Sequence, residues 1–255
     1  MAMRNEREPV HAPHPPLKAY FPSEAERRAW VRDIFDRTAV DYDRVERAMA
    51  FGSGPWYRRQ ALLRAGLAPG MRVVDVGTGT GLLAREAVRI VGDPRAVTGV
   101  DPSAGMRRNA ALPEGVRLLE GAAESIPLPD GCAEFLSMGY ALRHISDLEV
   151  AFREFHRVLA PGGVACILEI TRPASRLGTA VLKAYMRGFV PLLARVIART
   201  DDSPRLMRYY WDTIEACVPP EAVMRTLAAA GFAEVTRHVE LGVFSEYRAV
   251  KPRAA

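Results

Sequence analysis

The amino-acid sequence predicts an α/β protein in which helices cover both faces of a mostly parallel sheet. Three observations carry this prediction. Apolar strand-like segments alternate with helical periods from Met71 onward, a glycine-rich turn follows the first of these segments, and two strand-like segments close the chain with no helix between them. Regular alternation of strands and helices is typical of parallel sheets, because each parallel crossover needs a helix.

The periodicity of the apolar residues places each element. Strand-like segments lie at 71–76, 96–100, 116–120, 133–139, 162–169, 233–240 and 243–250, and helical periods lie at about 80–91, 103–111, 147–159 and 220–230. The sequence Pro161-Gly162-Gly163 marks the turn into the fifth strand. The last two strands meet near Gly242, so we expect a seven-stranded sheet with an antiparallel last strand.

Three further segments surround this sheet. Residues 1–22 carry five prolines among polar residues and are expected to form a flexible arm. Residues 23–70 predict an N-terminal helical cap, and the core runs from 71 to 255. Within the core, residues 174–216 show at least two helices and no strand, and we interpret them as a helical lid.

Composition excludes several classes of protein. Hydrophobic residues make up 49% of the chain and charged residues 25%, as in ordinary globular proteins, and no apolar segment reaches the roughly 18–20 residues of a membrane span. The three scattered cysteines lack metal-ligand spacing, so we expect reduced thiols, no metal and a cytoplasmic location. The net charge of +5 is interleaved with acids and predicts no nucleic-acid partner, although the basic pI keeps an RNA-binding protein as an alternative.

The glycine-rich turn at 73–83, VVDVGTGTGLL, predicts a nucleoside-binding site. Its glycines at 77, 79 and 81 let a ligand approach the backbone at a helix N-terminus. The fingerprint of NAD sites needs its third glycine at position 82, where this chain has a leucine, and the Asp75 carboxylate disfavours a pyrophosphate. S-adenosylmethionine (SAM) carries an ammonium and a sulfonium but no phosphate, and it suits this acid better. Asp101, at the end of the second strand, is placed to accept hydrogen bonds from ribose hydroxyls, as in NAD enzymes.

These segments resemble the motifs of class I SAM-dependent methyltransferases, which have a Rossmann-like fold. The matching segments are VVDVGTGTGLL, VTGVDPSAGM, GAAESIPLPDG and VLAPGG. More narrowly, the chain resembles the ubiquinone/menaquinone biosynthesis C-methyltransferase family over about 33–250. This second likeness is carried by IFDRTAVDYDRVERAMAFGSGPWYR, GYALRHISD and FREFHRVLAPGG.

The resemblance implies a set of cofactor-binding residues. They are Asp75, Gly77, Thr78, Gly79, Gly81, Asp101, Pro102, Met106, Ala122, Ala123, Met138 and Gly139. The family usually has Asp or Asn at the position of Ala122, so here we expect backbone and packing around Ala123 and Ile126 to hold the adenine.

Candidate catalytic residues are Arg143, His144 and Tyr42. Arg143 and His144 follow the fourth strand, at the sheet edge where ligands of open α/β folds bind, and His144 suits a proton acceptor. The resemblance implies that Arg143 helps to activate the nucleophile and that Tyr42 lies over the cofactor cleft. The alternatives are a structural salt bridge for Arg143, and a surface or packing role for His144.

The lid is expected to determine the substrate. Tyr185, Tyr209 and Trp211 are candidates for contacting a flat ring, and a place in the core is the alternative for the last two. One broad apolar face of the first lid helix includes Val181 and Phe189, and Lys183, Arg187, Arg195 and Arg199 lie on another face. We therefore expect an amphipathic lid whose basic face contacts solvent or, alternatively, a membrane surface.

The sequence thus predicts methyl transfer from SAM to a small aromatic or quinone-like substrate, at carbon before oxygen. An O- or N-methyltransferase of a specialised, polyketide-like pathway and a SAM-binding protein without methyl transfer remain alternatives. Peripheral membrane contact and a homodimer are the assemblies that the sequence leaves open.

Overall fold

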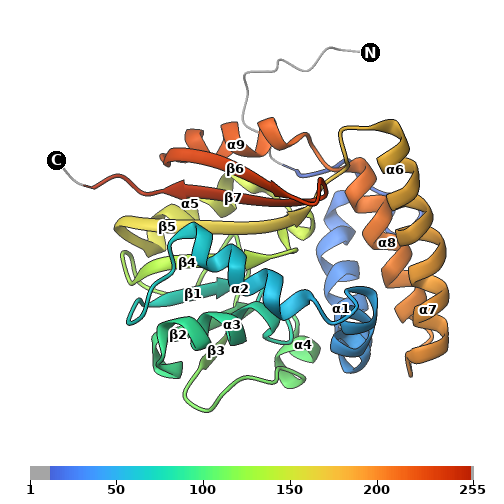
Figure 1. Ribbon diagram of the computed structural model, residues 1–255, viewed down its shortest axis with the longest axis horizontal. Helices are drawn as coiled ribbons and strands as arrows, with labels where there is room; N and C mark the ends of the chain where they lie inside the picture. The colour runs from blue at the N-terminus through green and yellow to red at the C-terminus, as the bar shows by residue number, and fades with distance from the viewer. Residues whose placement is uncertain (1–11, 254–255) are drawn as a thin grey trace.

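The computed structural model describes residues 12–253, so residues 1–11, which are half of the predicted arm and include His11, lie outside the described residues. A seven-stranded sheet with the order β3-β2-β1-β4-β5-β7-β6 forms its centre (Figure 1). The strands are β1 (Val73–Val76), β2 (Val97–Asp101), β3 (Arg117–Glu120), β4 (Ala133–Gly139), β5 (Leu159–Ile170), β6 (Ala233–Glu240) and β7 (Phe244–Val250). Strands β1 to β5 pair in parallel, and β7 runs antiparallel to both of its neighbours. The predicted fold class is confirmed.

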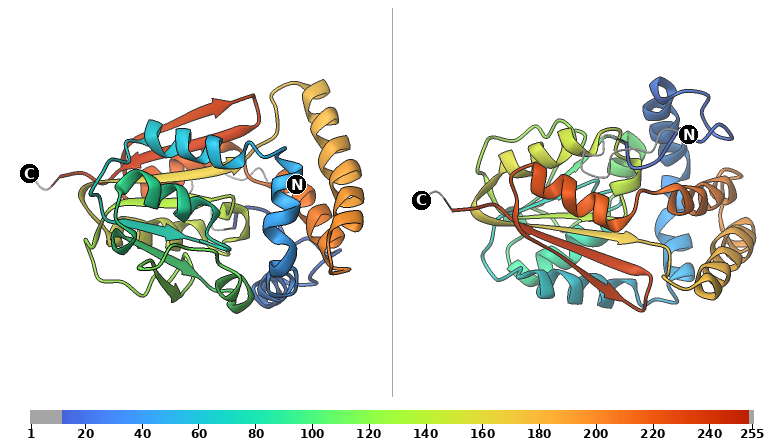
Figure 2. Two further views of the ribbon diagram at one scale, coloured as in Figure 1. Left: turned by 60° about the horizontal axis from the view of Figure 1, so that its bottom comes forward. Right: turned by 90° about the horizontal axis from the view of Figure 1, so that it is seen from above.

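Helices cover the sheet and extend beyond one of its edges. They are α1 (Glu24–Met49), α2 (Gly54–Ala65), α3 (Leu82–Val91), α4 (Ala104–Arg108), α5 (Leu148–Val158), α6 (Arg176–Lys183), α7 (Val190–Ile197), α8 (Ser203–Ala216) and α9 (Pro220–Ala229). Short 3-10 turns occupy Pro94–Ala96 and Leu142–His144. Helix α1 packs against α7 and α8, and together they form a helical layer beside the sheet (Figures 1 and 2).

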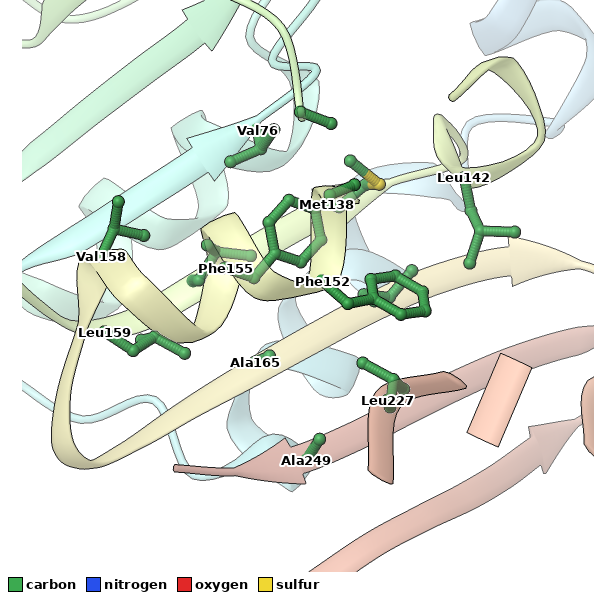
Figure 3. Packing of buried hydrophobic residues seen from close by; sticks show 14 of the residues in the cluster. Val76, Met138, Leu142, Phe152, Phe155, Val158, Leu159, Ala165, Leu227 and Ala249 are labelled. Atoms are coloured by element: carbon green, nitrogen blue, oxygen red, sulfur yellow. The ribbon is translucent and has the colours of Figure 1, made fainter. Parts of the chain in front are cut away.

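Two hydrophobic cores sandwich the sheet because alternate strand residues point to opposite faces. Val73 packs with α2 and α3 on one face, whereas Val74 packs with α5 and α9 on the other. In Figure 3, Phe152 and Phe155 of α5 lie over the strands on this second face. Both rings are fully buried, and the two cores fix the edge of the sheet from which the functional loops leave.

A third core joins the cap to the lid. It includes Phe21 before α1, Ile34 and Val45 on α1, Met186 in the lid, and Trp211 on α8. Residues 12–22 belong to the segment expected as a flexible arm, yet the Pro13 carbonyl accepts a hydrogen bond from Val218 N and Phe21 is 1% exposed. This part of the segment is therefore anchored against the lid.

The lid differs from its prediction in which residues it buries. Helices α6 and α7 are joined by a π-helical turn, Ala184–Phe189, which contains more residues per turn than an α-helix and so shifts the pattern of buried positions. Val181 and Phe189, predicted on the buried face, are 61% and 47% exposed. The outer face of the lid is consequently apolar as well as basic.

Other expectations concern the fifth strand, the thiols and the membrane. The Pro161-Gly162-Gly163 sequence forms an outward bulge within β5, where the pairing with β4 jumps from Leu159 to Val164. Cys132, Cys166 and Cys217 are free thiols. Within residues 12–253, no helix is both long and apolar enough to cross a membrane, and no group of His, Cys, Asp and Glu side chains could hold a metal ion.

Candidate functional site

The loop after β1 has the backbone of a ligand-binding turn. Gly77, Gly79 and Gly81 all have positive φ, the region that only glycine adopts without strain. A Cβ on Gly77 would lie 2.7 Å from Cβ of Ala141, so the loops after β1 and β4 touch at this glycine. A Cβ on Gly79 would meet no atom within 4 Å. The space beside Gly79 is thus open to a ligand, as a nucleoside-binding turn requires.

Two buried carboxylates stand at the base of this loop. Asp75 accepts hydrogen bonds from the hydroxyls of Thr78 and Ser137, and Asp101 accepts from Gly79 N at 2.7 Å and Ser103 N at 2.8 Å. Burial raises the pKa of each carboxyl to about 6, although these hydrogen bonds oppose the shift. Neighbouring carboxylates also raise both pKa values, so a cationic ligand would be stabilised here and a pyrophosphate would be repelled.

Helix α1 closes the same loop with two further acids. Asp43 accepts a hydrogen bond from the Thr80 hydroxyl and pairs with Arg85 at 3.1 Å. Asp36 accepts from Ser103 Oγ at 2.5 Å and from Gly105 N at 2.7 Å. The cap is therefore bonded directly to the loops after β1 and β2.

A buried ion pair occupies the neighbouring part of the sheet edge. Arg143, in the 3-10 turn after β4, contacts Glu169 at the end of β5, and both side chains are 1% exposed. Its Nε donates to the Thr213 hydroxyl of α8 at 3.1 Å. Burial disfavours the charge of Arg143, but Glu169, Tyr210 and other nearby groups together outweigh burial, and the pKa of the guanidinium lies above its usual value. Burial raises the pKa of the Glu169 carboxyl, and its Oε2 is buried with no hydrogen-bond partner among the described residues.

Aromatic side chains surround this ion pair. The Arg143 guanidinium lies 5.2 Å from the centre of the Tyr210 ring, and Tyr210 donates a hydrogen bond to the Tyr42 hydroxyl at 3.2 Å. The His144 ring stacks on Tyr209, whose hydroxyl lies 3.2 Å from Nδ1. Burial, together with the nearby guanidinium of Arg143, lowers the pKa of His144 well below its usual value. The imidazole is therefore neutral, and its buried Nε2 has no partner among the described residues.

The structure brings the three predicted catalytic residues together. Arg143 and His144 are consecutive, and Tyr42 reaches them through Tyr210. Among the predicted substrate residues, Tyr209 belongs to this group. Trp211 instead packs inside the lid and donates to Glu215 at 3.1 Å, while Tyr185 donates to the Met49 carbonyl at 2.5 Å.

The remaining predicted cofactor residues differ in their surroundings. Met106 N donates a hydrogen bond to Ser103 Oγ at the start of α4, and Pro102 beside this serine is exposed. Ala122 closes a short turn with Ser125 after β3, and Ala123 packs in the core. The Met138 side chain is fully buried in the same core. A Cβ on Gly139 would lie 3.2 Å from Leu83, so β4 and α3 are closely packed at this point.

Sequence reasoning missed four residues of the site. Glu169 is a buried acid in a strand-like segment whose pattern is otherwise apolar, and Tyr210 stands between the candidate residues Tyr209 and Trp211. Asp41 and Asp43 lie two residues apart on α1, and their spacing in the sequence does not indicate which of them contacts the glycine loop. Tyr140 has a positive φ of 60°, a strained conformation typical of functional loops that no sequence pattern reveals.

The residues of the glycine loop fit SAM. An open space beside Gly79, two buried carboxylates and the absence of a lysine or arginine hydrogen bond to either carboxylate among the described residues match a cationic, hydroxyl-bearing ligand. Asp101 and Asp75 would hold the ribose and the methionine part of such a ligand. With its Rossmann-like sheet, the protein is a SAM-dependent methyltransferase.

The chain belongs to the ubiE/COQ5 methyltransferase family, which it matches over residues 23–251. It is 30% identical to the ubiquinone/menaquinone biosynthesis C-methyltransferase of Azotobacter vinelandii, over 90% of this chain and 92% of that protein. The protein of the same name from Coxiella burnetii is 29% identical over 87% of this chain and 90% of its own.

Solved structures share the fold at lower identity. A SAM-dependent methyltransferase from Thermotoga maritima has a TM-score of 0.60 at 24% identity, covering 86% of this chain and 98% of its own. Phosphoethanolamine N-methyltransferase 2 of Haemonchus contortus, solved with SAM, has a TM-score of 0.54 at 17% identity, covering 78% of this chain and 53% of its own.

Proposed function

We propose that this enzyme transfers a methyl group to a ring carbon of a hydroquinone or related phenol. The observation that carries the proposal is the buried Arg143–Glu169 pair, which lies in an aromatic environment and leaves Glu169 Oε2 unpaired among the described residues. Two relatives are named C-methyltransferases of ubiquinone and menaquinone biosynthesis, and these names support the same class of acceptor.

In this proposal the bound SAM supplies an electrophilic methyl group. The acceptor ring becomes nucleophilic at carbon when its hydroxyl loses a proton, because the negative charge then spreads into the ring. Glu169 Oε2 accepts that proton, and its raised pKa suits this role better than an ordinary carboxylate would. Arg143 stabilises the resulting phenolate electrostatically. The new carbon–carbon bond replaces the bond between the methyl group and sulfur, and the ring carbon then loses its own hydrogen as a proton to solvent, which restores the aromatic ring.

The other aromatic residues orient the acceptor. The neutral His144 offers its unpaired Nε2 to an acceptor oxygen, and Tyr42 and Tyr210 cover the ring between cap and lid. The hydrogen bond between these two tyrosines joins α1 to α8 directly. Entry of an acceptor therefore requires α8 to move away from α1.

Product analysis tests this proposal. The enzyme is incubated with SAM and a panel of one-ring and two-ring hydroquinones, their O-methyl ethers and aromatic amines, and the methylated atom is located by NMR. We expect methyl on a ring carbon next to a free hydroxyl, and no product from the blocked ethers. A methyl group found on oxygen or nitrogen would contradict the proposal that carbon is the acceptor atom. The proposed role of the Arg143–Glu169 pair would then be wrong as well.

A further inference from the structure

The outer face of the lid carries a concentration of exposed apolar side chains. Twelve large apolar residues are exposed in the described part of the chain, and five of them lie between positions 177 and 196. They are Leu177 (75% exposed), Val181 (61%), Phe189 (47%), Leu192 (61%) and Val196 (77%). Scattered exposed apolar residues are normal, but a continuous set on one element marks an interaction surface.

These residues form one ridge rather than a scattered set. Helix α6, the π turn and α7 follow one another without a break from Arg176 to Ile197, and the spacing of the five residues returns them to the same side of this long helix. The helix forms the outermost layer of the molecule, beyond α8 and away from the sheet (Figures 1 and 2).

The charge of this segment is of one sign. Between Glu169 and Asp201 the sequence has six basic residues and no acidic one. Lys183 and Arg187 pair with acids of α8, whereas Arg195 and Arg199 make no ion pair within the part of the chain that the structure describes. An apolar ridge flanked by unpaired arginines is the pattern of a helix that lies in a membrane interface.

We propose that this lid face, consisting of Leu177, Val181, Phe189, Leu192 and Val196 with Arg195 and Arg199, docks the enzyme on an anionic lipid bilayer. The ridge inserts among the acyl chains while the guanidinium groups reach the lipid phosphates. A second copy of the chain fits less well, because a two-fold interface would place the arginines of this face opposite one another without any acid between them.

The proposed docking face lies next to the surroundings of Arg143 and Glu169, which we call the acceptor centre. Helix α8, on which α7 and the π turn pack, supplies Tyr210 and Thr213 to the surroundings of Arg143. Asp41 of α1 holds the end of this lid helix, accepting hydrogen bonds from Arg199 N at 2.7 Å and Thr200 N at 2.8 Å. Docking would therefore place the lid, and not the cofactor loop, between the bilayer and the acceptor centre. The inference goes beyond the proposed function and does not depend on which compound accepts the methyl group.

Vesicle flotation without any acceptor tests the proposal. We expect the full chain to float with phosphatidylglycerol-rich vesicles at low salt, and to bind much less to pure phosphatidylcholine or at high salt. Arg195→Gln/Arg199→Gln should lower the partition coefficient about fivefold for each charge removed. Leu192→Asp/Val196→Asp should lower it about tenfold or more.

Val150→Asp, at an exposed position of α5, is the matched control and should float like the wild-type chain. Circular dichroism and binding of the demethylated cofactor should be unchanged in all variants, since none of these side chains touches the site. Failure of the wild-type chain to bind anionic vesicles at low salt, or equal loss in the control, would overturn the proposal. The proposal would also be overturned if light scattering showed that the wild-type chain is a dimer, and if the lid variants were monomers that still bound vesicles.

Discussion

At the carboxyl edge of the sheet, the carboxylates near the ends of β1 and β2 each have a hydrogen-bond partner within three residues, whereas the side chain of Arg143 after β4 is bonded to distant segments. Asp75 pairs with Thr78 three residues away, and Asp101 with Ser103 two residues away. Arg143 instead pairs with Glu169, 26 residues away, and Thr213, 70 residues away. The proposed cofactor half is thus formed mainly by one βαβ unit, with added hydrogen bonds from Ser137 of β4 and from Asp36 and Asp43 of α1. The proposed acceptor half forms only when cap, sheet and lid have assembled.

This difference follows from what each half must bind. A cofactor that is the same for every member of the fold class can be held by a short loop with fixed glycines and acids. An acceptor varies between enzymes, and the acceptor site proposed here takes side chains from α1 and α8, which can change without altering the sheet. Four experiments test whether the two halves are as separate as their contacts indicate.

The largest effect is expected at the buried ion pair. Arg143→Ala should lower turnover about a hundred- to a thousandfold and should also destabilise the fold by about 3–5 kcal/mol, because it leaves Glu169 buried without its partner. Urea unfolding and steady-state kinetics measure the two effects.

A double variant separates stability from catalysis. Arg143→Leu/Glu169→Leu should recover most of the stability but not the turnover, and its affinity for the demethylated cofactor should match the wild type. Arg64→Ala, which breaks the ion pair between Arg64 of α2 and Glu246 of β7, serves as the control with normal turnover. A double variant that regained activity would show that the pair is only structural.

The next effect is expected at Asp101. Asp101→Ala removes a charged acceptor of the ribose hydroxyls, so affinity for SAM should fall about ten- to a hundredfold, while turnover at saturating SAM should change little. Isothermal titration measures the affinity. Glu120→Ala, at the end of the neighbouring strand with a 70% exposed side chain, is the control. Loss of turnover with unchanged affinity would place Asp101 in the acceptor half.

Lowering the pH should weaken the binding of SAM, because Asp75 and Asp101 titrate near neutral pH. Asp75 and Asp101 have folded-state pKa values of about 6, above the value of about 3.9 for an unfolded aspartate. Their contribution to the stability of the unliganded protein is therefore fully present below pH 4 and is lost as the pH rises through 6. A cationic ligand needs the ionised carboxylates, so its affinity should change in the opposite direction.

We expect the affinity for SAM to fall on the order of tenfold between pH 7 and pH 5. Isothermal titration at both pH values measures it, and Asp101→Asn should reduce the dependence. An affinity that is constant over this range would mean that neither carboxylate titrates against the ligand.

The smallest effects should distinguish two neighbouring positions on α1. Asp43→Asn weakens the bond to Thr80 in the cofactor loop, and SAM affinity should fall a few-fold. Asp41→Asn weakens the anchor of the lid at Arg199 and Thr200, so the KM for the acceptor should rise a few-fold with SAM affinity unchanged. If both variants changed the same constant, α1 would couple the two halves instead of serving each separately.

The sequence by itself determined the sheet, the order of its elements and the conformation of the glycine loop. Apolar periodicity specifies strands and helices wherever one face is buried, and the glycine loop contains in eleven residues nearly all that its conformation needs. The same reasoning placed Arg143 and His144 at the correct sheet edge, because parallel strands bring their carboxyl ends together.

Only the tertiary structure decided the acceptor half and the lid surface. The partner of Arg143, the neighbour of Tyr42 and the role of Asp43 depend on segments far apart in sequence, and spacing along one segment does not specify them. In the lid, Phe189 at the end of the π turn faces outward, and so does Val181 in α6 before the turn. Helical periodicity assumes an unbroken 3.6-residue turn, and it loses its predictive power where the backbone departs from that geometry.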